Sequence, residues 1–151
     1  MLGRAAPCFR AFAAILAILA SSAAVGRADD SADARAQVSA VSTALAGGSP
    51  ADAMTAFDRS FPKYEILKSY FEALVSAFRI TSEIDVNDED DAPTQIKVNV
   101  HWALTLQDLE TNYTENRAAD IDVQLVKQSG KWKITGFAPI DIFNPQQHRR
   151  R

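Results

Sequence analysis

The chain has 151 residues, of which 16 are Lys or Arg and 19 are Asp or Glu, so its net charge is −3 with both histidines neutral. An acidic chain lacks the concentrated positive charge with which proteins bind nucleic acid, and we expect no nucleic-acid partner. Cys8 is the only cysteine. Its position near the N-terminus excludes a disulfide scaffold, thiol chemistry and a cysteine metal site in the rest of the chain.

Residues 1–28 have the pattern of a secretory signal peptide. A basic start with two arginines is followed by a short apolar run at 11–20 and then by small residues. The run is shorter than the roughly 20 residues of a membrane-spanning helix, so we expect cleavage rather than a stable membrane anchor. Cleavage after Ala28 is favoured, with Ala24 as the second choice. The mature protein is expected to be exported, to the bacterial periplasm or the medium.

The remaining residues predict one domain and a short tail. Loss of the three leader arginines from the 16 basic residues leaves 13 against 19 acidic ones, a net charge of about −6. Residues 29–145 are long enough to form a single domain with its own core. Residues 146–151 contain the basic run HRRR, and we expect a solvated, disordered tail there.

Helical periodicity comes first along the chain. Residues 31–46 place Ala34, Val38, Val41 and Leu45 on one stripe, and a Gly-Gly pair follows as a stop signal. This pattern predicts an amphipathic first helix.

Two further helices are expected. The second begins at Pro50, with the Ser49 hydroxyl and the Asp52 carboxylate accepting hydrogen bonds from its free amide groups. Phe61-Pro62 ends it, and a third helix begins near Lys63. The third helix has the widest apolar face of the chain, formed by Tyr64, Leu67, Phe71, Leu74, Val75 and Phe78. We expect this helix to cover the sheet.

In the C-terminal half the apolar period changes to two, which predicts antiparallel strands. A first strand at 80–86 precedes an acidic loop at 87–93, whose spacing does not match a calcium-binding loop. The second and third strands are expected at 96–107 and at roughly 113–127. Their inward residues are predicted to be Ile96, Val98, Val100, Trp102, Leu104 and Leu106, and then Ile121, Val123 and Leu125.

Ser129-Gly130 fits a two-residue hairpin loop before a fourth strand that begins at Lys131. This loop sets the cross-strand neighbours. It pairs Gln128 with Lys131, Lys127 with Trp132, Leu125 with Ile134, and Val123 with Gly136. Helices followed by strands predict an α+β domain, in which three helices pack on a curved, mostly antiparallel four-stranded sheet.

The order of elements, the segment SGKWKITGF at 129–137 and the ending APIDIFNP at 138–145 resemble the nuclear transport factor 2-like superfamily, the cystatin-like α+β cone of the SnoaL-like proteins. More narrowly, the chain is similar to small exported bacterial members. The resemblance implies a cone-shaped sheet over nearly all of the mature chain. Such members include isomerases, dehydratases and hydrolases, but also transport factors and dimerisation modules. The catalytic patterns of the epoxide hydrolases and dehydratases have no match here, and no strand is predicted between the second and third helices.

Several inward-facing side chains are candidates for a ligand site. Large aromatic residues could either line an apolar cavity or fill the core. These are Tyr64, Phe71, Trp102 and Trp132. Arg117 shares the parity of Ile121, so its guanidinium could hold an anion with Tyr113 as a hydrogen-bond donor. The alternative is an exposed ion pair between Arg117 and Glu115, which contributes little to stability.

Asp141 is expected on the outer face or at a bend, with a buried general base as the alternative. The favoured function is a non-catalytic module that binds a small apolar or anionic molecule, forms a homodimer through its sheet face, or does both. The alternative is an isomerase or lyase with Glu115 or Asp141 as base and Tyr64 or Tyr113 as donor. No cofactor and no metal are predicted.

Overall fold

The structure is a computed structural model that describes residues 22–150, with side chains described for 28–147. Residues 1–21, and with them most of the predicted signal peptide, lie outside the described part, as does Arg151. The elements, in chain order, are α1 (Ser22–Ala46), α2 (Pro50–Met54), α3 (Tyr64–Ala77), β1 (Phe78–Asp91), β2 (Gln95–Asp108), β3 (Thr114–Gln128), β4 (Lys131–Ala138), and the short 3₁₀ helices η1 (Asp141–Phe143) and η2 (Pro145–Arg150).

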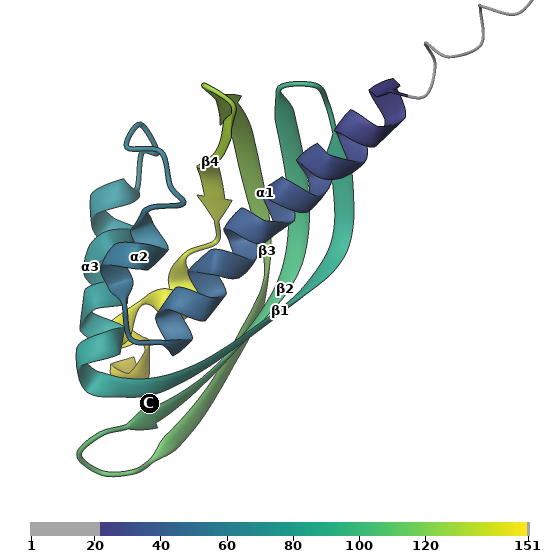
Figure 1. The fold of residues 1–151 in the computed structure, drawn as a ribbon. Helices are drawn as coiled ribbons and strands as arrows, with labels where there is room; N and C mark the ends of the chain where they lie inside the picture. The colour runs from purple at the N-terminus through teal and green to yellow at the C-terminus, as the bar shows by residue number, and fades with distance from the viewer. Residues whose placement is uncertain (1–21, 151) are drawn as a thin grey trace, which may run out of the picture.

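The four strands form one antiparallel sheet in the order β1-β2-β3-β4. Figure 1 shows that the sheet is strongly twisted and that the helices lie on one side of it. This arrangement confirms the predicted α+β class, with three helices followed by a four-stranded sheet.

The prediction that the third helix covers the sheet is corrected by the structure, in which α1 covers more of the strands than α3 does. Helix α1 runs diagonally across the sheet and contacts β1, β2 and β4, whereas α3 packs on the start of β1 and on η1 and η2. The stripe from Ala34 to Leu45 on α1 is buried, as expected. Its side chains are aliphatic and none is aromatic. Phe71 of α3 instead contacts the rings of Phe143 in η1 and of Phe57 in the loop after α2.

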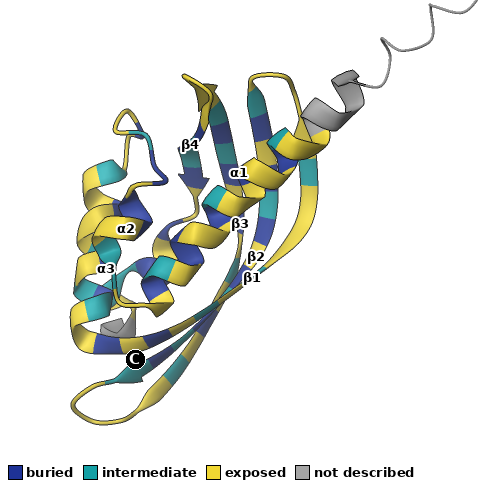
Figure 2. Ribbon diagram, viewed as in Figure 1, coloured by how far each residue is buried: buried dark blue, intermediate teal, exposed yellow. Residues whose placement is uncertain are grey.

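The core lies between the helices and the inner face of the sheet (Figure 2). Every inward residue predicted on β2 and β3 is at most 2% exposed, and Trp132 on β4 is equally buried. The period of two therefore assigned the faces of these strands correctly.

Most of the segment predicted as an acidic loop, 87–91, is part of β1, which continues to Asp91. A β-bulge at Asn87 shifts the register between Val86 and Asp88. Beyond the bulge Glu89 pairs with Arg35 and Asp91 accepts a hydrogen bond from Ser31, both on α1. These partners compensate carboxylates that would otherwise disfavour a strand.

The predicted register of β3 and β4 is correct as far as Leu125 and Ile134 and wrong beyond them. Thr135 is an extra residue in β4, so Gly136 lies opposite Gln124 and Phe137 opposite Val123. A Cβ atom on Gly136 would lie 3.0 Å from the Gln124 Cβ. The bulge and the glycine together bring the two strands close on the outer face.

The chain between α2 and α3 pairs with the edge of β4 instead of forming a strand. Phe57 and Ile134 form an isolated parallel bridge. The Asp58 amide donates to the Ile134 carbonyl at 2.8 Å, and the Ile134 amide donates to the Ala56 carbonyl at 2.8 Å. Pro50 and Asp52 occupy the predicted positions in α2, but the Ser49 side chain makes no capping hydrogen bond, which corrects that prediction.

Within residues 22–150, no helix is long and apolar enough to span a membrane. The same part of the chain contains no group of three or more His, Cys, Asp or Glu side chains that could hold a metal ion.

Candidate functional site

The space beneath the helices is filled by aromatic rings, which we call the aromatic cluster. It consists of Phe57, Phe71, Trp102, Phe137 and Phe143. Phe143, from η1, lies between the helix layer and the sheet, with ring centroids 5.2 Å from Phe71 and 5.4 Å from Trp102. Both contacts are edge-to-face, the favourable geometry for aromatic pairs. The arrangement supports the core-filling interpretation of Phe71 and Trp102.

The four aromatic residues predicted as ligand contacts are therefore not gathered in one cavity. Phe71 and Trp102 meet through Phe143. Trp132 contacts a different region, where its indole N–H donates to Asp30 of α1 at 3.4 Å. Tyr64 is half-buried at the start of α3 and lines a separate pocket described below.

Arg117 is buried and faces inward, as its parity predicts. Its Nη1 atom donates to the carbonyl oxygens of Ile142 and Asn144, each at 2.8 Å, and its Nε atom donates to Glu115 at 3.0 Å. The ion pair of Arg117 with Glu115 therefore forms as the alternative expected, but it is not exposed, because the Arg117 side chain is only 4% exposed. In this geometry Arg117 fixes the segment that carries Phe143.

The residues of the predicted general-base site do not point together into one cavity among the described pockets. Glu115 is engaged by Arg117. Tyr113 is 59% exposed, just before β3. Asp141 is exposed at the first position of η1, which agrees with the predicted bend rather than with burial.

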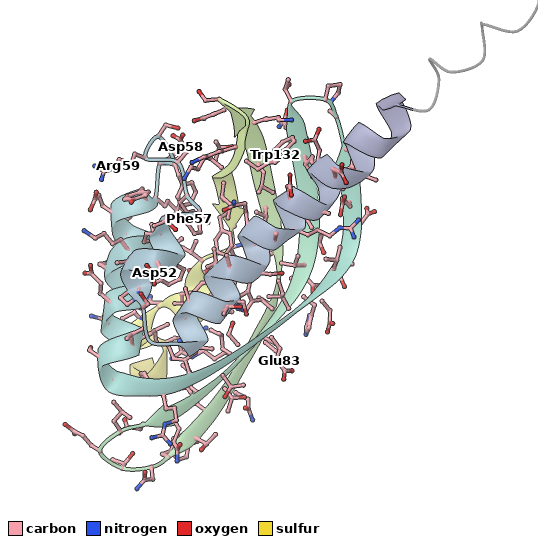
Figure 3. The ribbon with its side chains drawn as sticks, viewed as in Figure 1. Asp52, Phe57, Asp58, Arg59, Glu83 and Trp132 are labelled. Carbon is pink, nitrogen blue, oxygen red and sulfur yellow. The ribbon has the colours of Figure 1, made fainter. Side chains whose placement is uncertain are left out.

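A pocket of about 570 Å³ lies where α2, the following loop, α3 and β4 meet, and we call it the cationic pocket. Its apolar wall is formed by Met54, Phe57 and the ring of Tyr64. Arg59, Lys68 and Lys133 bring positive charge from three different elements. Figure 3 shows Asp58 and Arg59 on the loop between α2 and α3, above Phe57. The Lys133 ammonium is held by the Thr55 carbonyl at 2.6 Å.

Asp58 is the carboxylate of the cationic pocket. Hydrogen bonds from the Ser60 hydroxyl and then from the Ser60 amide hold the pKa of Asp58 below its ordinary value, and the charge of Lys133 acts in the same direction. Asp58 is thus ionised at neutral pH, and three cations face one anion. Sequence reasoning identified only Tyr64 here, because Arg59 and Lys133 lie far apart in the chain and meet only through the bridge between Phe57 and Ile134.

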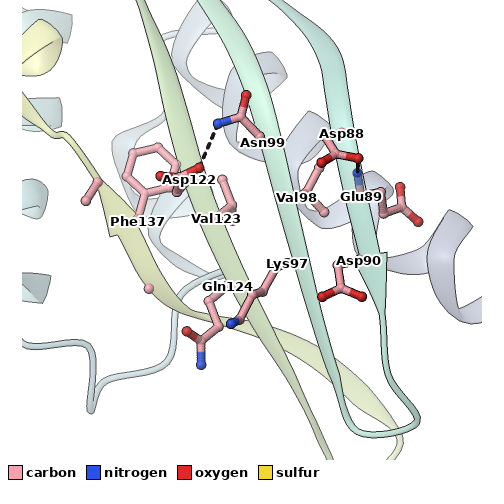
Figure 4. Close-up of a pocket in the computed structure, with 12 residues that line it drawn as sticks. Asp88, Glu89, Asp90, Lys97, Val98, Asn99, Asp122, Val123, Gln124 and Phe137 are labelled. Atoms are coloured by element: carbon pink, nitrogen blue, oxygen red, sulfur yellow. Dashed lines mark hydrogen bonds between the residues drawn. The ribbon is translucent and has the colours of Figure 1, made fainter.

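A second hollow, of about 470 Å³, crosses the face of the sheet that is turned away from the helices, and we call it the outer groove (Figure 4). Its rim is formed by Asp88, Asp90, Lys97, Asn99, Asp122 and Gln124. Its floor is formed by Val98, Val123, Gly136 and Phe137. The Asn99 amide donates to Asp122 at 2.6 Å across β2 and β3.

A ladder of polar side chains continues along the outer face from the groove. The bulged Asn87 donates to Asn99 at 2.9 Å and to Asp120 at 3.3 Å. His101 lies 2.8 Å from Asp120, and this contact, more than any other, lowers the pKa of Asp120.

Comparison of the sequence with protein-family models and with curated proteins finds no match. Comparison of the structure with solved structures finds 33 matching chains. A conserved protein from Planctomyces limnophilus has a TM-score of 0.69 at 10% identity, covering 75% of this chain and 96% of that one. A ketosteroid isomerase-like protein from Erwinia carotovora has a TM-score of 0.60 at 13% identity, covering 70% and 91%.

A nuclear transport factor 2-like superfamily protein from Salmonella enterica has a TM-score of 0.59 at 8% identity, covering 78% of this chain and 92% of that one. Identities this low show a shared fold and nothing finer. The twisted sheet, the helix layer and these likenesses together identify the architecture: the chain has the nuclear transport factor 2-like, cystatin-like α+β fold.

Proposed function

We propose that the chain is a non-catalytic binding module whose ligand is a small anion with an apolar part, held in the cationic pocket. The observation that carries the proposal is the convergence of Arg59, Lys68 and Lys133 on one apolar wall. The interior of the cone, by contrast, is occupied by the aromatic cluster.

The chemistry of the cationic pocket matches a carboxylate or phosphate attached to an apolar group. Arg59 offers a planar fork of donors to paired oxygens, and Lys68 adds an ammonium group. The Lys133 ammonium donates to the Thr55 carbonyl, so it supplies charge at a defined place, and Lys68 also lies 3.9 Å from Glu72 in an exposed ion pair. Apolar walls with a few placed polar groups are typical of small-molecule sites.

The positions of the carboxylates favour binding over catalysis. A proton-abstracting enzyme needs a base within hydrogen-bond reach of a bound substrate. Glu115 serves as a partner of Arg117, and Asp141 is exposed on η1. Asp58 is kept ionised by Ser60 and lies among cations, where a lowered pKa makes a weak base.

The experiment is a two-dimensional NMR titration with three probes of one shape: benzoate, benzyl alcohol and benzylamine. We expect benzoate to shift the signals of Thr55 and Tyr64 at lower concentration than the other two probes. Lys68→Gln and Arg59→Gln should each weaken benzoate binding by about fivefold, the range of a partly exposed charge pair. Lys63→Gln is the matched control, because Lys63 is exposed beside α3 but does not line the pocket.

Two results would refute the proposal. One is equal binding of all three probes, which would leave no role for the cations. The other is a set of benzoate shifts centred on Trp102, which would place the ligand in the cone. Export and homodimer formation through the sheet face stay predictions that this titration does not address.

A further inference from the structure

The outer groove is shaped by two β-bulges. Asn87 interrupts β1 and Thr135 interrupts β4, on opposite sides of the groove. Bulges bend and twist the strands that contain them. Gly136, opposite Gln124, leaves the floor without a side chain at the place where the strands approach. The outer face is therefore hollowed at this height of the sheet instead of being flat.

The rim of the outer groove is acidic. Asp88, Asp90 and Asp122 are exposed, and Lys97 is the one cation among the lining residues. Figure 4 shows these side chains rising from three neighbouring strands around the groove. Glu89 also belongs to the lining, but its charge is compensated by Arg35 of α1. Like charges on opposite sides of a narrow hollow attract a cationic partner and repel an anionic one.

The chain carries a segment of the complementary charge. Residues 148–151 read HRRR, the one basic run in an acidic protein. The backbone of 145–150 forms η2, which packs against α3 in the helix layer, so the basic run begins within this short helix. The outer groove lies on the other face of the sheet from that layer, which favours the groove of a second molecule over the chain's own groove.

We propose that the outer groove binds the basic C-terminal segment, residues 148–151, of a second copy of this chain. Arginine forms paired hydrogen bonds with carboxylates, and the exposed Asp88, Asp90 and Asp122 can receive three guanidinium groups. Each contact is between the C-terminal segment of one molecule and the outer groove of another. Two molecules form a closed dimer when each binds the segment of the other. The inference is independent of the ligand proposed for the cationic pocket.

The test uses the full chain with Arg149→Gln, Arg150→Gln and Arg151→Gln as the acceptor, so that its own segment does not compete. A synthetic peptide of residues 144–151 is titrated into it by NMR. We expect shifts at Asn99, Asp122 and Gly136, and weaker binding when the ionic strength rises from about 0.05 M to about 0.5 M. A peptide in which Gln replaces the three arginines should leave these signals in place.

Substitutions in the outer groove of the same acceptor should change its affinity for the peptide in opposite directions, according to the charge that is removed. The double change Asp90→Asn and Asp122→Asn should weaken peptide binding by about tenfold, because two exposed pairs are lost while the side-chain shapes are kept. Lys97→Gln should strengthen binding by about threefold, because it removes the repelling charge. Asp52→Asn, an exposed aspartate on α2, should change nothing.

Light scattering on the unmodified chain completes the test. At low salt we expect association that the three arginine substitutions abolish. The proposal is overturned if both proteins are equally monomeric or equally associated. It is also overturned if the peptide fails to bind at about millimolar concentration, or binds the double Asn acceptor as well as its parent. Circular dichroism of each variant confirms that a lost contact does not reflect a lost fold.

Discussion

Phe143 contacts the indole of Trp102 edge-to-face, with ring centroids 5.4 Å apart and an interplanar angle of 87°. The contact joins η1, near the C-terminal end of the domain, to β2 of the sheet. Phe143 is fully buried and also contacts Phe71 and Phe137. The C-terminal segment is thus part of the core rather than an extension of it.

Truncation of this ring should have a large effect on stability. We expect Phe143→Ala to lower the free energy of unfolding by about 3–5 kcal/mol, because it removes buried ring contacts and leaves a cavity. Urea denaturation followed by tryptophan fluorescence measures the loss, and Trp102 reports directly on the site. Ile66→Ala is the control, because Ile66 is 48% exposed on α3 and should cost less than about 1 kcal/mol. A similar loss in both variants would contradict a packed interior.

Arg117 should be as important as the ring that it positions. Removal of its side chain in Arg117→Ala leaves the carbonyls of Ile142 and Asn144 without their donor and Glu115 without its cation. Breaking a buried pair from one side costs about 3–5 kcal/mol. Lysine cannot reach two carbonyls and a carboxylate at once, so Arg117→Lys should recover less than half of the loss.

The control for Arg117 is Arg79→Ala, since Arg79 is an exposed residue of β1. Denaturation in urea gives the two losses, and NMR signals of residues 142 and 144 show whether η1 detaches. If Arg117→Ala kept full stability but lost affinity for benzoate, the guanidinium would be a ligand contact and the structural role would be refuted.

The fold was largely predictable, because the apolar residues recur with a period of two in the strands and with helical spacing in the helices. These periods indicate which side chains are buried. Val98, Val123 and Leu125 were assigned to the correct face by parity alone. Alternation assigns the wrong face to residues that follow a β-bulge, because the bulge inserts one residue into the strand. The sequence pattern does not show where such an insertion occurs. Thr135 and Asn87 therefore escaped prediction, and with them the shape of the outer groove.

The cationic pocket was less predictable than the sheet, for a topological reason. Arg59 and Lys133 are distant in sequence and become neighbours only because Phe57 bridges to Ile134. Exposed charged residues follow no sequence period from which their proximity in the fold could be predicted. Phe143 did carry a signal, since it follows Ile140 and Ile142 in an apolar ending, but nothing in the sequence shows that this ending folds back under α3.

The close approach at Gly136 gives a prediction that depends on one neighbour. Gly136→Ala places a Cβ atom 3.0 Å from the Gln124 Cβ, tighter than ordinary contact, so we expect a loss of about 1 kcal/mol. Gln124→Gly in the same chain should remove most of that penalty. A double-mutant cycle in urea measures the coupling, and simple additivity of the two changes would contradict the predicted contact.

The lowered pKa of Asp30 predicts that the free energy of unfolding decreases at acidic pH. A hydrogen bond from Lys127 holds the pKa of Asp30 below its ordinary value of 3.8, against the opposing effect of partial burial, and Trp132 adds a weaker hydrogen bond. A lowered pKa in the folded state means that the stabilisation is present above pH 3.8 and is lost as the pH falls through the lower folded value.

Lys127→Gln should therefore raise the pKa of Asp30 toward 3.8 and flatten the pH dependence of unfolding below that pH. Carboxyl NMR titration measures the first effect, and urea midpoints at several acidic pH values measure the second. Lys131→Gln, an exposed lysine at the start of β4, should change neither. An unchanged Asp30 titration in Lys127→Gln would show that the ion pair is not formed.

The predicted export signal can be tested against the first contacts of the domain. Asp30 contacts Lys127 and Trp132, and Ser31 contacts Asp91, so tertiary contacts begin within three residues of the predicted cleavage site after Ala28. Cleavage there would leave these contacts intact. We expect the protein produced with its leader in a bacterial host to appear in the periplasmic fraction with Asp29 as its first residue, as measured by intact mass.

Stability measurements on shortened chains separate processing from folding. A chain that begins at Asp29 should unfold at the same urea concentration as one that begins at Ser22, whereas a chain that begins at Ala34 should be less stable because the contacts of Asp30 and Ser31 are lost. Equal stability of all three chains would show that these contacts contribute nothing. Recovery of uncleaved protein from the membrane fraction would refute the predicted cleavage, because it would show that the apolar run stays in the bilayer as an anchor although it is shorter than a membrane-spanning helix.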